Sequence, residues 1–352
     1  MVKIAIDTLG GDKSPDANIE GAISALDKYS DISLVFLGCE KAIVQKLDSL
    51  KISPEKRERV EIIDAPDIIT GEDKPTDAIR LKKDSSMVRA MKLLREDESV
   101  KALISTGATG ALVALATLRI GRLRGVRRPA FCPIMPTMNG GIVAVCDSGA
   151  NVECTPRQLC EFASMGSVYL SEAFGIKEPR VALLNVGTES EKGDDLRKEA
   201  YKMLSELDNI NFVGNMESRD LLSGKFDLVV CDGFAGNVLI KSTEGACLEM
   251  LKKLKKDINS KLINKIGALF MYKMFMEEKE FMNYQNYGGS VLLGCEKIIV
   301  KGHGSSDGKA VAVCVDQAYR MIENDISKKT ESALSVLDKF DQIEDAGEKN
   351  NV

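Results

Sequence analysis

The chain has 352 residues, a net charge of −5 and 44% hydrophobic residues, which suffices for a large core in an undivided α/β domain. Aromatic residues make up 5% and tryptophan is absent, which disfavours stacked-base recognition of nucleic acid, and the negative charge argues against general polyanion binding. One histidine and nine cysteines without a C-x-x-C pair disfavour a zinc site and a disulfide framework and favour a reducing compartment.

The chain opens on a strand pattern, MVKIAID, rather than on a signal peptide. No apolar run is long enough to span a bilayer, so we expect a cytoplasmic protein. Apolar runs rich in Ile, Val and Leu predict strands that are covered on both faces. These runs are 3–7, 34–38, 60–64, 102–105, 142–147, 181–187, 228–232 and 297–300.

Helical patterns lie between the predicted strands. Two of them have a clear start, because Ser14-Pro15 and Thr155-Pro156 each place a capping hydroxyl before a proline at the first helical position. The alternation predicts a doubly wound three-layer α/β/α sandwich. We expect it to occupy residues 1–327 as a single catalytic domain, before a charged trailing helix and tail at 328–352.

Polar, glycine-rich turns follow six of the predicted strands. Ligands of such sheets bind beyond the carboxyl ends of the strands, where turn N–H groups suit an anion or a developing oxyanion. The candidate site residues in these turns are Asp7, Gly10, Gly11, Asp12, Gly107, Thr109, Gly110, Asn151, Asp232, Gly233, Gly236, Asn237, His303, Gly304, Ser305 and Ser306. No G-x-G-x-x-G, Walker A or G-x-S-x-G motif occurs, so the donors favour holding a phosphate and a carbonyl oxygen over a covalent nucleophile.

Two basic stretches are further candidates for binding an anion. The first carries Arg80 with Ser85 and Ser86, which either contact phosphate or belong to a solvent-facing helix. The second lies in a region without acidic residues, and it predicts either a patch for an acidic partner or a solvated helix end. Its arginines are Arg119, Arg122, Arg124, Arg127 and Arg128.

The segment 247–283 departs from the α/β rhythm. A lysine-rich amphipathic helix is followed by an apolar stretch that includes Leu262, Ile266, Leu269 and Phe270, and Gly267 is a candidate bend. The pattern predicts a helical hairpin that projects from the sandwich. It is typical of a dimerisation pair and also of an interfacial membrane helix, and the two roles are compatible.

Taken together, these stretches resemble the bacterial phosphate acyltransferases of phospholipid synthesis, the PlsX family. The matching stretches cover roughly residues 3–320 in the family's order: IAIDTLGGDKSP, RLKKDSSM, STGATGAL, RRPA, DSGAN, FASMGSVY, RVALLNVGTESEKG, FVGNMESRD, VVCDGFAGNVLIKSTEG and YGGSVLLG with HGSS. Two positions depart from the family's pattern, since Ala108 stands where asparagine is usual and Lys13 where histidine is usual. Roles for those two side chains are therefore not carried over.

The resemblance implies transfer of a fatty acyl group from acyl carrier protein to inorganic phosphate, without a cofactor. The product would be an acyl phosphate for phosphatidic acid synthesis by a downstream membrane glycerol-3-phosphate acyltransferase. It also implies a fold similar to isocitrate and isopropylmalate dehydrogenases and to phosphotransacetylase. A homodimer and peripheral membrane association follow from the same resemblance, and the arginine cluster is then a candidate patch for the acidic carrier protein.

Direct attack of phosphate on a thioester requires positioning more than a covalent relay. We expect the hydroxyls of Ser305, Ser306 and Thr109 to hold phosphate, helped by Lys241 or Arg80, with no metal. Asn237 and the backbone near Gly236 would face the carbonyl oxygen as it gains charge. His303 either protonates the leaving thiolate, orients phosphate or only supports its turn. Three carboxylates would orient the turns by accepting N–H bonds: Asp7, Asp12 and Asp232.

Three other functions fit parts of the pattern. A phosphotransacylase that uses coenzyme A in place of the carrier protein is the nearest. A dehydrogenase of the isocitrate type would need metal-binding aspartates and a dinucleotide loop, of which we find no convincing version. A non-enzymatic scaffold that recruits lipid enzymes to the membrane would bind phosphate without turnover.

Overall fold

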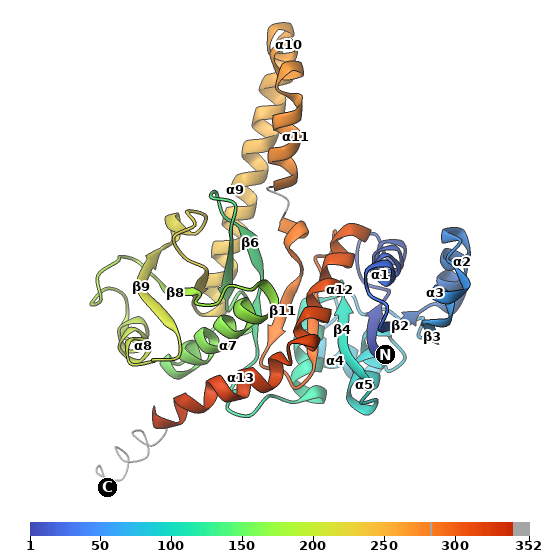
Figure 1. Ribbon diagram of the computed structural model, residues 1–352, viewed down its shortest axis with the longest axis horizontal. Helices are drawn as coiled ribbons and strands as arrows, with labels where there is room; N and C mark the ends of the chain where they lie inside the picture. Colours follow the sequence, from blue (N-terminus) through green and yellow to red (C-terminus); the bar gives the residue numbers. More distant parts are fainter. Residues whose placement is uncertain (282–283, 341–352) are drawn as a thin grey trace.

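The computed structural model describes residues 1–281 and 284–340, whose strands form two neighbouring sheets flanked by helices (Figure 1). The first sheet has the order β3-β2-β1-β4-β12-β11-β5, and the second has the order β6-β7-β10-β8-β9. Bounds in the first sheet are β1 Val2–Asp7, β2 Ile32–Gly38, β3 Val60–Asp64, β4 Val100–Ser105, β5 Ala130–Cys132, β11 Ser290–Leu293 and β12 Ile298–Lys301. Bounds in the second are β6 Ile134–Pro136, β7 Ile142–Cys146, β8 Arg180–Asn185, β9 Asn211–Glu217 and β10 Leu228–Val230.

The α/β prediction is confirmed. Each predicted strand is present, and its observed ends differ from the predicted ends by at most two residues. The strands are divided between two sheets, however, whereas we expected a single one. Four further strands escaped prediction: β5, β6, β9 and β11. Three of them pair antiparallel with their neighbours, β5 and β11 in the first sheet and β6 in the second.

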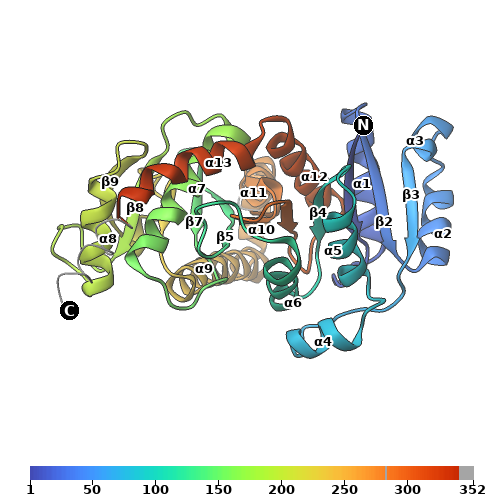
Figure 2. The same ribbon diagram turned by 90° about the horizontal axis from the view of Figure 1, so that it is seen from below.

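Helices cover both faces of each sheet (Figure 2). In the first sheet α1 and α12 pack on one face and α5 on the other, and in the second α7 and α8 lie opposite α9. The helices are α1 Asp16–Lys28, α2 Glu40–Leu50, α3 Pro54–Glu58, α4 Pro75–Leu81, α5 Ser86–Glu96, α6 Thr109–Leu115, α7 Pro156–Phe174, α8 Asp195–Ser205, α9 Gly233–Ser260, α10 Leu262–Phe270, α11 Tyr272–Phe281, α12 Gly308–Glu323 and α13 Ile326–Leu334.

The two sheets share one core and are joined through a short stretch of chain. Buried side chains from Ile4 on β1 to Val181 on β8 belong to one continuous cluster. Between the sheets, β5 ends at Cys132 and β6 begins at Ile134, so a single residue, Pro133, separates a strand of the first sheet from a strand of the second. The carboxyl ends of β12 and β7 therefore lie beside the same junction.

One of the two predicted helix starts is correct. Thr155 caps α7 in a capping box with Gln158, and Pro156 is its first residue. The prediction that Ser14 caps the first helix is wrong. The Ser14 hydroxyl accepts the Gly11 N–H (2.8 Å), and α1 begins at Asp16 without a side-chain cap. The hydroxyl thus stabilises the turn after β1 instead of the helix.

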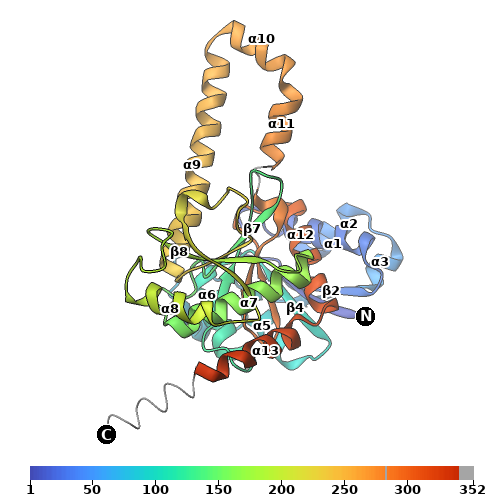
Figure 3. The same cartoon turned by 60° about the vertical axis from the view of Figure 1, so that its left-hand side comes forward.

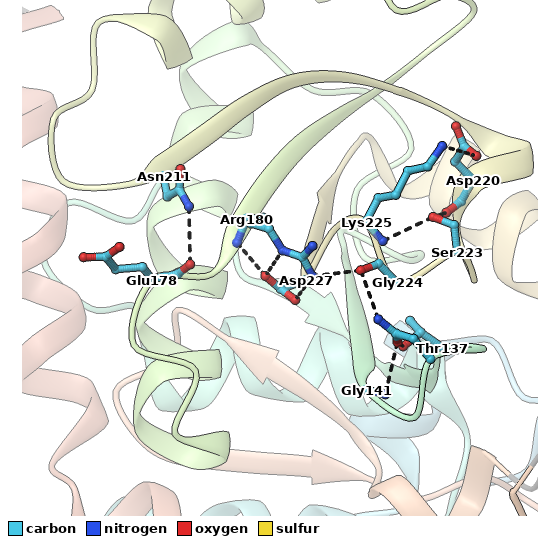
Figure 4. Close-up of polar contacts among 11 residues, drawn as sticks. Thr137, Gly141, Glu178, Arg180, Asn211, Asp220, Ser223, Gly224, Lys225 and Asp227 are labelled. Carbon is cyan, nitrogen blue, oxygen red and sulfur yellow. Dashed lines mark hydrogen bonds and ion pairs between the residues drawn. The ribbon is translucent and has the colours of Figure 1, made fainter.

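An ion pair between Arg180 and Asp227 joins the amino ends of β8 and β10 in the second sheet (Figure 4). The Arg180 guanidinium donates to both carboxylate oxygens of Asp227, at 2.9 and 2.8 Å, and to the carbonyl of Gly224. The Asn139 amide donates to the same carbonyl from the β6–β7 turn. The bidentate geometry holds β8, β10 and this turn in register.

The helices α9, α10 and α11 form the projection seen at the top of Figure 3. The prediction of a helical hairpin is confirmed for the described part of 247–283, which excludes residues 282 and 283. The bends lie at Lys261 and Met271, between the helices, and not at Gly267, which lies inside α10. Of the 328–352 segment, α13 contains the predicted trailing helix and packs on α7, and residues 341–352 lie outside the described residues.

Candidate active site

A cavity of about 170 Å³ lies at the junction of the two sheets, beside the carboxyl end of β12. One part of its wall is polar and contains five of the predicted site residues: Thr109, Asn237, Lys241, His303 and Ser306. The remaining wall is largely apolar, with Phe131, Pro133, Ile134, Met135 and Ile240. Glu244, Ser148 and Lys301 also line it and were not predicted.

The turn after β1 is held by a buried carboxyl group. Asp7 Oδ2 accepts the hydroxyl of Ser105 (2.7 Å), and Oδ1 accepts the Ser86 hydroxyl and the Leu9 N–H (3.2 Å). Burial raises the pKa of Asp7, and the two hydroxyl bonds oppose that rise. Asp7 therefore acts as we predicted, as an acceptor that orients turns.

Close backbone contact brings the turns after β1, β4 and β12 together. A Cβ added at Gly10, whose φ is +102°, would lie 2.6 Å from the Cα of Gly107. The Asp12 N–H donates to the Gly304 carbonyl (2.7 Å), and the Gly302 N–H donates to the Ser105 carbonyl (2.9 Å). Glycine is needed at Gly10 both for the backbone angle and for the space.

The histidine turn presents a neutral imidazole at the cavity. His303 Nδ1 accepts the Ser305 N–H (3.2 Å) and lies 2.8 Å from the Ser305 hydroxyl, an arrangement that favours the ring proton on Nε2. Burial and the nearby Lys241 ammonium lower the pKa of His303 below its ordinary value. The ring is therefore uncharged at neutral pH, and Ser305 supports it.

Lys301 is the buried cation of the site. It is the last residue of β12, is only 8% exposed, and donates to the carbonyls of Thr106 (3.3 Å) and Gly302. Burial lowers its pKa from 10.5 to about 8. The available sequence signal was its position directly after the predicted strand 297–300, at the start of the glycine turn.

The second sheet contributes the start of α9. Asp232 caps this helix by accepting the Ala235 N–H (2.9 Å) and also pairs with Arg197, so it orients a turn as predicted. Gly236 packs so closely on the preceding turn that a Cβ there would lie 1.9 Å from the Asp147 carbonyl oxygen. These contacts place Asn237 and Lys241, one helical turn apart, on the cavity wall.

Several predicted site residues stabilise the surrounding turns and helices and do not line the cavity. Asn151 is buried and donates to the Asp147 carboxylate (2.9 Å) and the Pro129 carbonyl (2.8 Å). Ser85 caps α5. Ser86 donates to Asp7, and both serines are buried and lie outside the cavity wall, so they correspond neither to a phosphate contact in the cavity nor to a solvent-facing helix. Arg80 is exposed on α4, pairs with Asp77 at 3.9 Å and is not part of the cavity wall.

Arg119 and Arg122 of the arginine cluster lie at the amino end of β12, on the opposite edge of the sheet from the cavity. The Leu123 N–H donates to the Gly294 carbonyl (3.0 Å), and Arg122 bridges to Cys295, both just before the strand. The four residues of β12 correspond to about 10 Å of chain between this edge and the cavity. The structure therefore does not bring these two arginines to the other predicted residues.

In the part of the chain that the structure describes, no group of three or more His, Cys, Asp or Glu side chains could hold a metal ion. The same residues contain no helix that is both long and apolar enough to cross a bilayer. At the tip of the projection, in contrast, all four residues expected to contact a membrane are exposed: Leu262, Ile266, Leu269 and Phe270.

Comparisons with known proteins agree with the sequence motifs. The family model described as "Fatty acid synthesis protein" matches residues 2–329. A phosphate acyltransferase of Clostridium novyi is 42% identical over 95% of this chain and 98% of its own length. One from Alkaliphilus oremlandii is 43% identical over 97% of this chain and 100% of its own.

Solved structures share the fold at low sequence identity. A phosphotransacetylase from Streptococcus pyogenes has a TM-score of 0.59 at 16% identity, covering 92% of this chain and 94% of its own. A branched-chain phosphotransacylase from Enterococcus faecalis has a TM-score of 0.53 at 13% identity, covering 92% of this chain and 100% of its own. At these identities the likeness shows the fold alone.

Proposed function

The chain belongs to the fatty acid synthesis protein family, whose phosphate acyltransferases transfer an acyl group to phosphate, and we propose that its acyl donor is the thioester of an acyl carrier protein. The acyl phosphate product would enter phosphatidic acid synthesis through a membrane glycerol-3-phosphate acyltransferase. No cofactor or metal takes part in this proposal.

The observation that carries the proposal is the divided wall of the cavity. Its polar part offers hydroxyl, amide and ammonium donors to phosphate, and its apolar part, from Phe131 to Met135 with Ile240, suits the first carbons of an acyl chain. A volume of about 170 Å³ is below the roughly 300–1,000 Å³ of pockets that enclose whole ligands. The cavity therefore suits the reacting groups, with most of a long chain outside it.

In the proposed reaction, an oxygen of hydrogen phosphate attacks the thioester carbonyl carbon. The new C–O bond forms as the C–S bond breaks, and the proton of the phosphate hydroxyl passes to the sulfur, so that acyl phosphate and free thiol balance the reactants. Ser306 and Thr109 would hold the phosphate, and Asn237 would donate to the carbonyl oxygen as it gains charge. His303, which is neutral and whose Nδ1 accepts the Ser305 N–H, would position the phosphate by its Nε2–H.

The tip of the α9–α11 projection is the proposed membrane contact. Exposed Leu262, Leu269 and Phe270 beside Lys261 and Lys265 at the tip suit the surface of an anionic membrane. We expect a homodimer that displays two such tips and adds their weak affinities. A peripheral location would place an insoluble acyl product next to a membrane enzyme.

Substrate competition tests the donor. Purified protein receives palmitoyl-carrier protein or palmitoyl-coenzyme A with phosphate, and acyl phosphate is trapped with hydroxylamine as the hydroxamate. We expect turnover with the carrier and little with coenzyme A. Turnover with coenzyme A alone would replace the carrier as donor, and binding of phosphate without turnover would indicate a scaffold. If Ser305→Ala and His303→Ala both left the rate unchanged, the assigned site would be wrong.

A further inference from the structure

The ammonium group of Lys301 has no direct ion-pair partner among the described residues. Its three N–H groups have two recorded acceptors, the carbonyl oxygens of Thr106 and Gly302, and both are neutral. Throughout 1–281 and 284–340, no carboxylate forms an ion pair with Lys301. Burial of an unpaired cation is costly, because desolvation is not offset by a nearby negative charge.

The groups around Lys301 supply that charge only in part. Asp7, Ser105 and Lys301 lie in one row across β1, β4 and β12, and Ser105 stands between the other two. Asp7 attracts Lys301 across this row and offsets part of the effect of burial on the pKa of Lys301. Its oxygens, however, accept the Ser86 and Ser105 hydroxyls and a backbone N–H and form no direct ion pair with the ammonium.

The neighbours on the helices are also unsuitable. Burial raises the pKa of the Cys314 thiol on α12 to about 12, so that the thiol is neutral. On α9, Glu244 pairs with Lys241 at 2.8 Å. Lys241 and neutral His303 add no negative charge near Lys301.

The side chain is nevertheless part of the cavity wall, together with Asn237, Lys241, His303 and Ser306. An anion in the cavity would therefore complete the ion pair that the protein leaves open. Phosphate is the anionic substrate of the proposed function, on which this step rests.

We propose that Lys301 is a catalytic residue whose ammonium contacts the attacking phosphate and holds it at the floor of the cavity. The group keeps its protons throughout, since the proton of hydrogen phosphate accounts for the leaving thiol. Lys241, which is half exposed and paired with Glu244, assists at the mouth and is of lesser importance. A buried charge pair with phosphate is worth more than an exposed one, because solvent screens it less.

Binding of inorganic phosphate to the full-length protein tests the assignment by isothermal titration calorimetry. We expect Lys301→Met to weaken phosphate binding by about 100-fold and the matched control Lys241→Met to weaken it by less than about 10-fold. Unchanged phosphate affinity in Lys301→Met would overturn the proposal. Thermal unfolding of each variant verifies that the protein is folded.

A second measurement uses the unmodified protein. Lys301 loses its ammonium proton as the pH rises through about 8, so phosphate affinity should begin to fall near pH 8 and continue to fall towards about pH 10. Constant affinity over this range would overturn the proposal even if the methionine variant did not fold. Phosphate binding that depends on Lys301, without turnover of either thioester, would support this inference while refuting the proposed function.

Discussion

Replacing Lys301 by methionine should stabilise the free protein while it removes phosphate binding. Methionine keeps most of the volume of the lysine stem and removes a buried cation that has only carbonyl partners. The fall in the pKa of Lys301 from 10.5 to about 8 means that carrying the charge costs the folded protein roughly 3 kcal/mol of stability at neutral pH. Two lost hydrogen bonds cost about 1 kcal/mol each, so the expected net gain is about 1 kcal/mol.

The gain should depend on pH in a defined direction. Because the folded pKa lies below the unfolded one, the unfolded chain binds more protons between about pH 8 and about pH 10.5. The stability of the original protein therefore rises over that range as the charge penalty disappears. The advantage of Lys301→Met should be largest below about pH 8 and should turn into a deficit towards about pH 10.5, where the charge penalty is gone and the two lost hydrogen bonds still cost about 1 kcal/mol each.

Urea unfolding at about pH 7 and about pH 10.5, followed by circular dichroism, measures both effects. Lys241→Met is the control and should change the free energy of unfolding by less than about 1 kcal/mol, since the Lys241 side chain is 56% exposed and solvent screens its charge. Added phosphate should stabilise the original protein and not Lys301→Met. A variant that is less stable than the original by 1 kcal/mol or more at about pH 7 would refute the reasoning, because Lys301 would then be compensated.

Three further outcomes follow from the geometry. Gly236→Ala should lower the free energy of unfolding by about 3 kcal/mol in urea, because its Cβ would meet the Asp147 carbonyl, whereas Gly245→Ala, with no atom in the way, should raise it by about 0.5–1 kcal/mol. Arg122→Glu should leave the KM for the acyl carrier unchanged in the turnover assay, because Arg122 lies on the edge away from the cavity, and a several-fold rise would restore the cluster as a docking patch. Phe270→Ser should reduce cosedimentation with anionic vesicles about tenfold without changing turnover of soluble thioester, and undiminished binding would exclude the tip as the membrane contact.

The strands and their terminal turns were predictable because they depend on local patterns. Near-continuous Ile, Val and Leu runs identified the parallel strands, and glycine with Asp, Asn or Ser identified the turns. The division into two sheets was not predictable, because it depends on which distant strands pair. The crossing at Pro133 involves strands of only three residues, β5 and β6, which are too short to show a period.

The site was only partly predictable for a related reason. The sequence indicates which residues lie near the carboxyl ends of strands, but not which way each side chain points. Ser86 faces the buried Asp7 and not the cavity, while Lys301, at the end of an apolar strand, faces the cavity. The arginine cluster is prominent in the sequence, but the path of the chain takes Arg119 and Arg122 to the amino edge of the sheet.

Rapid-quench kinetics test the central claim, direct transfer of the acyl group to phosphate, most directly. Enzyme at a concentration comparable with palmitoyl-carrier protein is mixed with and without phosphate, and free carrier thiol and hydroxamate-trapped acyl phosphate are followed together. Direct transfer predicts no thiol release without phosphate and equal amounts of both products with it. A burst of free carrier in the absence of phosphate, equal to the amount of enzyme, would reveal an acyl-enzyme and contradict the account.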